Sequence, residues 1–467
     1  MSAASFDELT ARFLAWFKAL PGATFSDAID IKDLRGRRAG RGIVAVQDIA
    51  PETTLFTIPR KAIVNVETSD LRKKLPALFE EDDVADDDGH GDEDGDDTKK
   101  QQLDSWTSLI LIMMYEFLLD DQSSWKSYFE VLPESFDTPM FWSENELREL
   151  QASATVGKIG REAADDMFRG TLLPAIRGNP DVFVGSSQRS DDELVTLAHR
   201  MGSTIMAYAF DLENDEEDDD EEDGWVEDRE GKAMMGMVPM ADIMNADAEF
   251  NAHVNHGDDN LTVTALRPIK AGEEILNYYG PHPNSELLRR YGYVTPRHSR
   301  YDVVEIPWPL VEEALSAQLN ISPETLAKVH ADLDEELEDT FVLERECPEV
   351  NSDGTFTAAA TAPEIPADLT EQLKEFLKGV RAIDASLVPD KRKRDEISTA
   401  VVGSVLESLS AQYPTSIEQD EGLLQAGGMD ERAKMAVAVR LGEKILLREA
   451  LAVVGGSDGS NKRARTE

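Results

Sequence analysis

The chain has 467 residues, of which 41% are hydrophobic, so it is long enough to bury the cores of two or three domains. Its 93 acidic and 47 basic residues give a net charge of −46 at pH 7, which disfavours direct binding to nucleic acid. The single cysteine, Cys347, excludes an internal disulfide framework and a cysteine-based zinc cluster, and it fits a reducing, intracellular compartment.

Two acidic runs, residues 80–97 and 213–230, supply much of the negative charge. Such runs are typical of solvated, disordered loops, because they contain too few apolar residues to bury. They also suit a role in attracting a basic protein. The composition leaves both interpretations open.

The N-terminal segment has the pattern of an amphipathic helix rather than of a secretory signal. Ser5 and Glu8 have the spacing of a capping box, and apolar residues recur on one face until Pro21 ends the pattern. The apolar stretch 109–119 contains Glu116 and is too short to span a bilayer. We therefore expect a buried helix there and no membrane association.

A basic, glycine-rich turn at residues 35–42 precedes two expected strands, 43–46 and 54–58. Gly40 and Gly42 have no Cβ, so the backbone could approach a ligand closely. A G-x-G turn by itself is more typical of an ordinary hairpin, so the turn alone is weak evidence for a ligand site.

The centre of the chain has helical periodicity, and β structure returns near residue 261. Residues 261–266 alternate as a strand, 270–273 form a turn, and 274–279 are expected to form a second strand that ends at Gly280. The last part is helical again. The expected helices are 106–119, 143–150, 165–173 and 191–208, with Ser143 and Asp191 as caps, and later 369–380, 397–413 and 430–454.

Several segments together resemble the SET-domain protein lysine methyltransferases, in the branch of the Rubisco large-subunit and SETD-six-like enzymes. Residues 239–245 (PMADIMN) are similar to P-x-A-D-x-x-N, residues 272–280 (GEEILNYYG) to G-E-E-I-x-x-x-Y, and residues 284–293 (NSELLRRYGY) to N-x-x-L-L-x-x-Y-G-F. Residues 128–133, 139–142 and 206–210 resemble segments of that branch's helical insertion. The sequence Asn-Ala-Asp at 245–247 looks most like the fungal ribosomal lysine methyltransferase 4 group.

The resemblance implies an α+β fold in which a large helical insertion splits a β-rich SET domain and an all-helical, substrate-binding module follows. The boundaries expected are a helix at 1–24, the SET halves at 25–65 and 236–306, the insertion with its acidic loops at 66–235, the helical module at 307–455 and a disordered basic tail at 456–467.

Methyl transfer from a sulfonium to an amine is an in-line displacement that needs alignment and exclusion of water, and no metal. By resemblance, Tyr279 is the catalytic tyrosine. Tyr278 would point to the opposite face of a strand, so it is the weaker candidate. S-adenosyl-L-methionine is the implied cofactor, and its candidate binding residues are Gly40, Arg41, Gly42, Tyr208, Asn245, Ala246 and Tyr291. Most members have His where this chain has Ala246, so a contact of that side chain with adenine is absent.

The resemblance implies a basic protein substrate: a 60S ribosomal protein first, and a histone or other nuclear protein as an alternative. Ala246 favours another alternative, a SET-fold binding protein without catalysis, and an acidic histone chaperone would explain the acidic runs alone. Basic clusters at 391–394 and 462–465 predict import into the nucleus, with the cytoplasm as a second compartment. The first cluster equally fits a solvated helix start. We expect a monomer.

Overall fold

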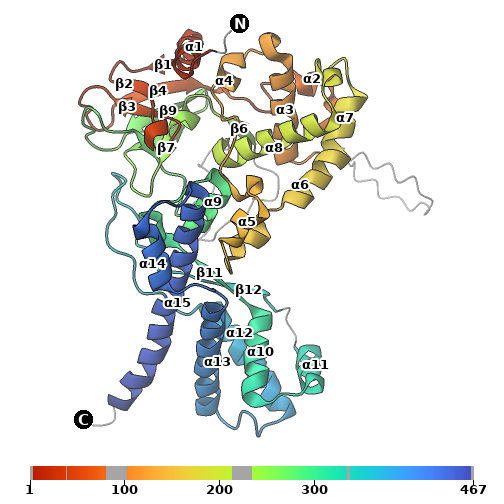
Figure 1. Ribbon diagram of the computed structural model, residues 1–467, viewed down its shortest axis with the longest axis vertical. Coiled ribbons are helices and arrows are strands. Elements are labelled where there is room, and N and C mark those ends of the chain that lie inside the picture. Colours follow the sequence, from red (N-terminus) through yellow and green to blue (C-terminus); the bar gives the residue numbers. More distant parts are fainter. Residues whose placement is uncertain (1–3, 38, 80–102, 213–233, 334–336, 464–467) are drawn as a thin grey trace, which may run out of the picture. The chain divides into compact units, whose positions relative to one another are not determined.

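The computed structural model describes residues 4–37, 39–79, 103–212, 234–333 and 337–463, with side chains to residue 456. Both acidic runs therefore lie outside the described residues. The chain divides into two compact units (Figure 1). The first contains residues 1–136, 160–279 and 352–355, and the second contains residues 137–159, 280–351 and 356–467.

The first unit combines a small β domain with a group of helices. Its strands are β1 (Thr24–Phe25), β2 (Ile29–Asp33), β3 (Arg41–Ala45), β4 (Thr54–Pro59), β5 (Ala209–Asp211), β6 (Met235–Met237), β7 (Asn245–Ala246), β8 (Ala252–His256), β9 (Asn260–Ala265) and β10 (Leu276–Asn277). Its helices are α1 (Phe6–Ala19), α2 (Leu71–Lys74), α3 (Ser105–Leu119), α4 (Lys126–Phe129), α6 (Arg161–Met167), α7 (Leu173–Gly178) and α8 (Asp191–Tyr208).

The β structure is assembled from segments far apart in the sequence. A four-stranded sheet has the order β1-β4-β9-β8, and strands β2 and β3 form a separate antiparallel pair. The short strands β7 and β10 pair in parallel, with Leu276 opposite Asn245 and Asn277 opposite Ala246. The pairing of β4 with β9 joins the two halves of the domain on either side of the helical insertion.

The helices confirm most of the expectations from periodicity. The capping box of Ser5 and Glu8 is present at α1, and α3 is buried on nearly all sides, as its uniformly apolar sequence predicts. Helix α8 lies beside α3 (Figure 1). The cap of α8 was predicted wrongly: Ser190, not Asp191, has the extended backbone and accepts from the backbone N–H of Glu193. Asp191 instead occupies the first helical turn.

The second unit is mainly helical and also contains a two-stranded sheet. Its elements are α5 (Glu144–Arg148), α9 (Asn284–Tyr291), β11 (Val304–Pro307), α10 (Trp308–Leu319), α11 (Pro323–Asp332), β12 (Thr340–Leu343), α12 (Ala367–Ile383), α13 (Lys391–Ala411), α14 (Ile417–Ala426) and α15 (Glu431–Arg463). The apolar stripe predicted for α12 is confirmed, because Leu369, Leu373, Phe376, Leu377 and Val380 are all buried in the core of this unit.

The grouping into units differs from the predicted segments in three places, one of which is the short stretch 352–355 in the first unit, and the domain boundaries stay predictions. Residues 137–159, expected to belong with the insertion, join the second unit, because Trp142 and Leu150 pack in one apolar cluster with Leu288 and Val439. Residues 280–306 also belong to the second unit rather than to the returning SET half. Helix α15 runs from Glu431 to Arg463, and the disordered tail expected at 456–467 stays a prediction.

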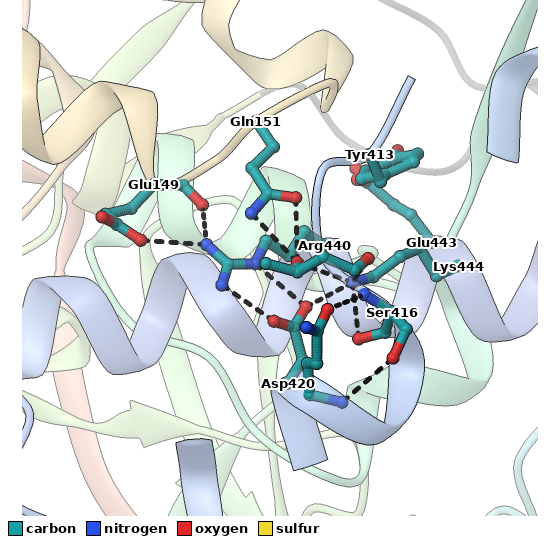
Figure 2. A network of polar contacts seen from close by, with 10 residues as sticks. Glu149, Gln151, Tyr413, Ser416, Asp420, Arg440, Glu443 and Lys444 are labelled. Carbon is teal, nitrogen blue, oxygen red and sulfur yellow. Dashed lines mark hydrogen bonds and ion pairs between the residues drawn. The ribbon is translucent and has the colours of Figure 1, made fainter. Parts of the chain in front are cut away.

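A buried ion cluster, made of Asp420, Arg440 and Lys444, links α14 and α15 within the second unit (Figure 2). Arg440 donates to both oxygens of Asp420, at 2.8 and 3.0 Å, and Lys444 donates to Oδ2 of the same carboxylate. The three side chains are 0%, 1% and 5% exposed, respectively. Arg440 also pairs with Glu149 at 3.0 Å, and this contact fastens the chain after α5 to α15.

Candidate functional site

The candidate site lies in the first unit, where the turn before β3, strand β7 and the chain leading into β10 come together. The backbone N–H of Ile275 donates to the carbonyl of Ile43 (2.8 Å), and that of Ala45 donates to the carbonyl of Glu273 (2.9 Å). The expected strand 274–279 is reduced to a bridge between Glu274 and Val44 and the two residues of β10. The prediction thus located this segment correctly, but the strand that it predicted was too long.

Asn245 ties the turn to this segment through its side chain. Its Nδ2 donates to Oε1 of Glu274 at 2.6 Å and to the main-chain carbonyl of Arg41 at 3.2 Å. Among the residues that the structure describes, Oδ1 of Asn245 has no hydrogen-bond partner. An acceptor in this position suits a ligand that carries N–H donors.

The two glycines of the turn have different functions. Gly40 adopts a left-handed conformation with φ +63°, and a Cβ added there would meet no atom within 4 Å, so its backbone borders open space. A Cβ on Gly42 would lie 2.4 Å from Cδ1 of Leu34, 2.8 Å from Oε1 of Glu274 and 2.9 Å from Nδ2 of Asn245. Gly42 is therefore required for the close packing of the turn against Asn245.

Arg41 contributes through its main chain, whereas its side chain is used for packing. The guanidinium lies 3.9 Å from the centre of the Phe6 ring and donates to Oγ1 of Thr10 and to the carbonyl of Val131. Burial lowers the pKa of Arg41 below its ordinary value. The assignment of Arg41 to the cofactor residues stays a prediction, and its main-chain carbonyl accepts from Nδ2 of Asn245 beside the candidate site.

Tyr279 follows β10 and reaches the same segment as Asn245. Its hydroxyl donates to the carbonyl of Met244 at 3.0 Å. The preceding residue, Tyr278, stacks on Phe250 with the ring centres 4.6 Å apart. Tyr279 is thus anchored beside Asn245, while the ring of Tyr278 packs on another aromatic residue.

Ala246 and Tyr208 complete the predicted residues of the first unit. Ala246 pairs through its backbone with Asn277, opposite it in β10. Tyr208 is the last residue of α8, directly before β5. Tyr291 belongs to the second unit, at the end of α9, where burial raises its pKa to about 12. The structure therefore brings together Gly40, Arg41, Gly42, Asn245, Ala246 and Tyr279 within one unit.

A carboxyl group near the site belongs to the segment 239–245, where the sequence suggests that it organises the turn or caps a helix. Asp242, in the short turn before β7, accepts a 2.5 Å hydrogen bond from the hydroxyl of Tyr128, and its carboxyl group is buried. Burial raises the pKa of Asp242 to about 7. Both Asp242 and Glu274 lie within the matched segments 239–245 and 272–280, and neither was predicted to bind the cofactor or to take part in catalysis.

The features of the turn fit the methionine end of S-adenosylmethionine. An open backbone at Gly40 and an acceptor without a partner at Asn245 would hold an ammonium group and carboxylate oxygens. No group of three or more His, Cys, Asp or Glu side chains within the described ranges is arranged to hold a metal ion. Of the helices that the structure describes, none is long and apolar enough to cross a membrane.

Comparison with known proteins agrees with this geometry. Residues 40–280 match the SET domain family, and residues 315–447 match the family described as Rubisco LSMT substrate-binding. The chain is 33% identical over 329 residues to ribosomal lysine N-methyltransferase 4 of Saccharomyces cerevisiae. The aligned region covers 69% of this chain and 62% of the yeast protein, so it spans less than two thirds of the yeast protein's length. It is 28% identical over 445 residues to human N-lysine methyltransferase SETD6, covering 89% and 85% of the two chains.

Solved structures show the same fold. The structure of Rubisco LSMT bound to sinefungin and monomethyllysine aligns with a TM-score of 0.64 at 20% identity, over 98% of this chain and 93% of that one. At this identity the likeness establishes the architecture, and the chemistry of this chain has to be argued from its own residues.

Proposed function

Because the chain belongs to the SET domain family, we propose that it is a protein-lysine N-methyltransferase that uses S-adenosyl-L-methionine and acts on a basic protein. The observation that carries this proposal is the position of Tyr279, whose hydroxyl is fixed on Met244, the residue before Asn245. The proposed catalytic tyrosine and the proposed cofactor-binding asparagine therefore lie on chain segments that are in contact.

The cofactor, when bound, supplies an electrophilic methyl group on a sulfonium. The hydroxyl of Tyr279 donates its only proton to the carbonyl of Met244, so toward a substrate it acts as an acceptor. An acceptor can orient an N–H of the lysine amine without adding charge. The lysine has to be neutral to attack, and an apolar channel beside a cationic sulfonium lowers its pKa.

A ribosomal protein of the large subunit is the proposed substrate. The yeast relative bears the name of a ribosomal lysine methyltransferase, and the net charge of −46 favours a strongly basic partner. A histone or another nuclear protein satisfies the same charge argument, so it is the alternative substrate. We propose that the second unit, which includes the match at residues 315–447, binds this protein and that the enzyme is a monomer.

Nuclear entry is also proposed, either from the basic cluster 462–465, whose side chains lie outside the described residues, or from the basic residues 391–394. They form the first turn of α13, capped by Asp390, and Arg392 pairs with Glu396 at 3.0 Å. This is equally the arrangement of a solvated helix start. A fluorescent fusion of the full chain, compared with one in which Lys391 and Arg392 are replaced by Gln, tests it, because retention of the nuclear signal would contradict the assignment.

A SET-fold binding protein without catalysis is the second candidate, because Ala246 replaces the histidine that most family members carry. The two functions are distinguished by transfer of labelled methyl from S-adenosylmethionine to purified ribosomal proteins and, separately, to core histones. Wild type, Tyr279→Phe and the matched control Tyr278→Phe should be compared.

Label in one ribosomal band that is lost in Tyr279→Phe and kept in Tyr278→Phe supports the proposed enzyme and its substrate. Label in histones alone keeps the reaction and overturns the substrate. If neither set is labelled and calorimetry detects no cofactor binding, the binding protein becomes the better account.

A further inference from the structure

The side-chain amide of Asn245 has a defined orientation. Its nitrogen carries two hydrogens, and the two acceptors around it are Oε1 of Glu274 (2.6 Å) and the carbonyl of Arg41 (3.2 Å). A flipped amide would place its oxygen against both acceptors, so the network allows only one assignment. Oδ1 of Asn245 is therefore the amide atom that can accept a hydrogen bond from a ligand bound in the site.

Of the two acceptors, Glu274 provides the stronger interaction, because its hydrogen bond is shorter and involves a carboxylate. The main chain of Glu274 is itself held in place. Its carbonyl accepts from Nδ2 of Asn251 at 2.8 Å, and the residue forms a β-bridge with Val44. A side chain at position 42 would clash with both the carboxylate and the amide, so Gly42 leaves the space that this pair needs.

We propose that Glu274 is a positioning residue for the cofactor: its carboxylate holds the amide of Asn245 so that Oδ1 accepts from an N–H group of S-adenosylmethionine. The inference rests on the proposed function and extends it to a residue outside the predicted site. Loss of the carboxylate allows the amide to rotate and to present its NH2 group to the cofactor's donors. Loss of a charge-assisted hydrogen bond should weaken the binding of the cofactor by about 10-fold to 100-fold.

Calorimetric titration of the full chain with S-adenosylhomocysteine tests the inference. Asn245→Ala and Glu274→Ala should weaken binding by similar factors, and the double variant should be no weaker than either, because the two residues act as one unit. Glu274→Gln should bind nearly as well as wild type, since its amide oxygen can still accept from Asn245. Glu273→Ala is the matched control, because the side chain of this exposed neighbour interacts with Lys270 and, among the described residues, forms no hydrogen bond with Asn245.

A donor exchange separates positioning from a general structural role. Asn245→Asp places a carboxylate beside Glu274 and should weaken binding strongly. Adding Glu274→Gln supplies a donor for the new aspartate, so the double variant should bind better than Asn245→Asp alone. Thermal unfolding of each variant shows whether folding, rather than orientation, has changed.

Weaker binding in Asn245→Ala with unchanged binding in Glu274→Ala overturns the inference, as does an additive loss in the double variant. Unchanged binding in Asn245→Ala overturns it as well, because the asparagine then does not bind the cofactor. That last result would not contradict the proposed methyltransferase activity, because the labelling assay with Tyr279→Phe tests that activity independently.

Discussion

The buried ion cluster of the second unit allows a quantitative prediction about stability. Asp420 is 0% exposed and is the only carboxylate of that cluster, so Asp420→Ala leaves two buried cations without their shared anion. Removing one partner of a buried pair typically costs about 3–5 kcal/mol, because the remaining charge stays desolvated.

Two compensating contacts place the expected value at the lower end of that range. Arg440 keeps Glu149, whose side chain is 51% exposed, and Lys444 keeps hydrogen bonds to the carbonyls of Thr415 and Ser416 (2.9 and 3.3 Å). We therefore expect Asp420→Ala to lower the free energy of unfolding by about 3 kcal/mol. For a unit of this size that corresponds to a fall in Tm of roughly 6–12 °C.

Differential scanning calorimetry measures the change, and amide exchange in α14 and α15 assigns it to the second unit. Glu421→Ala is the control, because Glu421 is exposed on the same helix and should change stability by less than about 0.5 kcal/mol. Hydrogen bonds from Arg440 and Lys444, working against burial, hold the pKa of Asp420 below its usual range. Its stabilising effect should therefore shrink as the pH falls below about 4. A loss under about 1 kcal/mol at neutral pH would refute the reasoning.

Three further predictions concern the candidate site. Tyr279→Phe should lower kcat by about 100-fold or more while the Kd for S-adenosylhomocysteine stays unchanged, and equal losses of both would indicate a structural role instead. Gly42→Ala should weaken cofactor binding by at least about 10-fold in calorimetry, since the added methyl group overlaps Asn245; binding equal to wild type would mean that the turn relaxes freely. Burial raises the pKa of Asp242 to about 7, so this carboxyl binds more protons in the folded state than in the unfolded state. The free energy of unfolding of the wild type should therefore fall between about pH 4 and pH 7. Urea titrations of Asp242→Asn over this range should show a smaller slope of that free energy against pH. Identical slopes would contradict the assignment to this carboxyl.

Local patterns in the sequence predicted the elements that depend on neighbouring residues. The capping box at Ser5, the buried helix α3 and the apolar stripe of α12 all follow from spacing within one turn or two. The predicted positions of β3, β4 and β9 were also right, because each alternates over several residues. The mixed α+β fold and its membership of the SET family are confirmed.

Pairings across long sequence distances could not be predicted from these patterns. Nothing in the sequence near Asp420 indicates that it will bind Arg440 and Lys444. These two cations lie four residues apart within the apolar pattern of α15, and this spacing could have indicated a buried acidic partner. The grouping of Trp142 with the second unit depends in the same way on tertiary packing. Within the site, the adjacency of Tyr279 and Asn245 came from resemblance, and the function of Glu274 came only from the structure.

The replacement of histidine by Ala246 bears on the choice between enzyme and binding protein. Ala246 takes part in the parallel pairing of β7 with β10 through its backbone, opposite Asn277, so the change removes a side chain without removing the pairing. The same pairing sets Asn245 opposite Leu276, three residues before Tyr279, whose hydroxyl is fixed on Met244. The positions of Asn245 and Tyr279, the proposed cofactor-binding and catalytic residues, thus do not depend on the side chain at 246. The departure from the family pattern argues for weaker cofactor binding rather than for loss of catalysis.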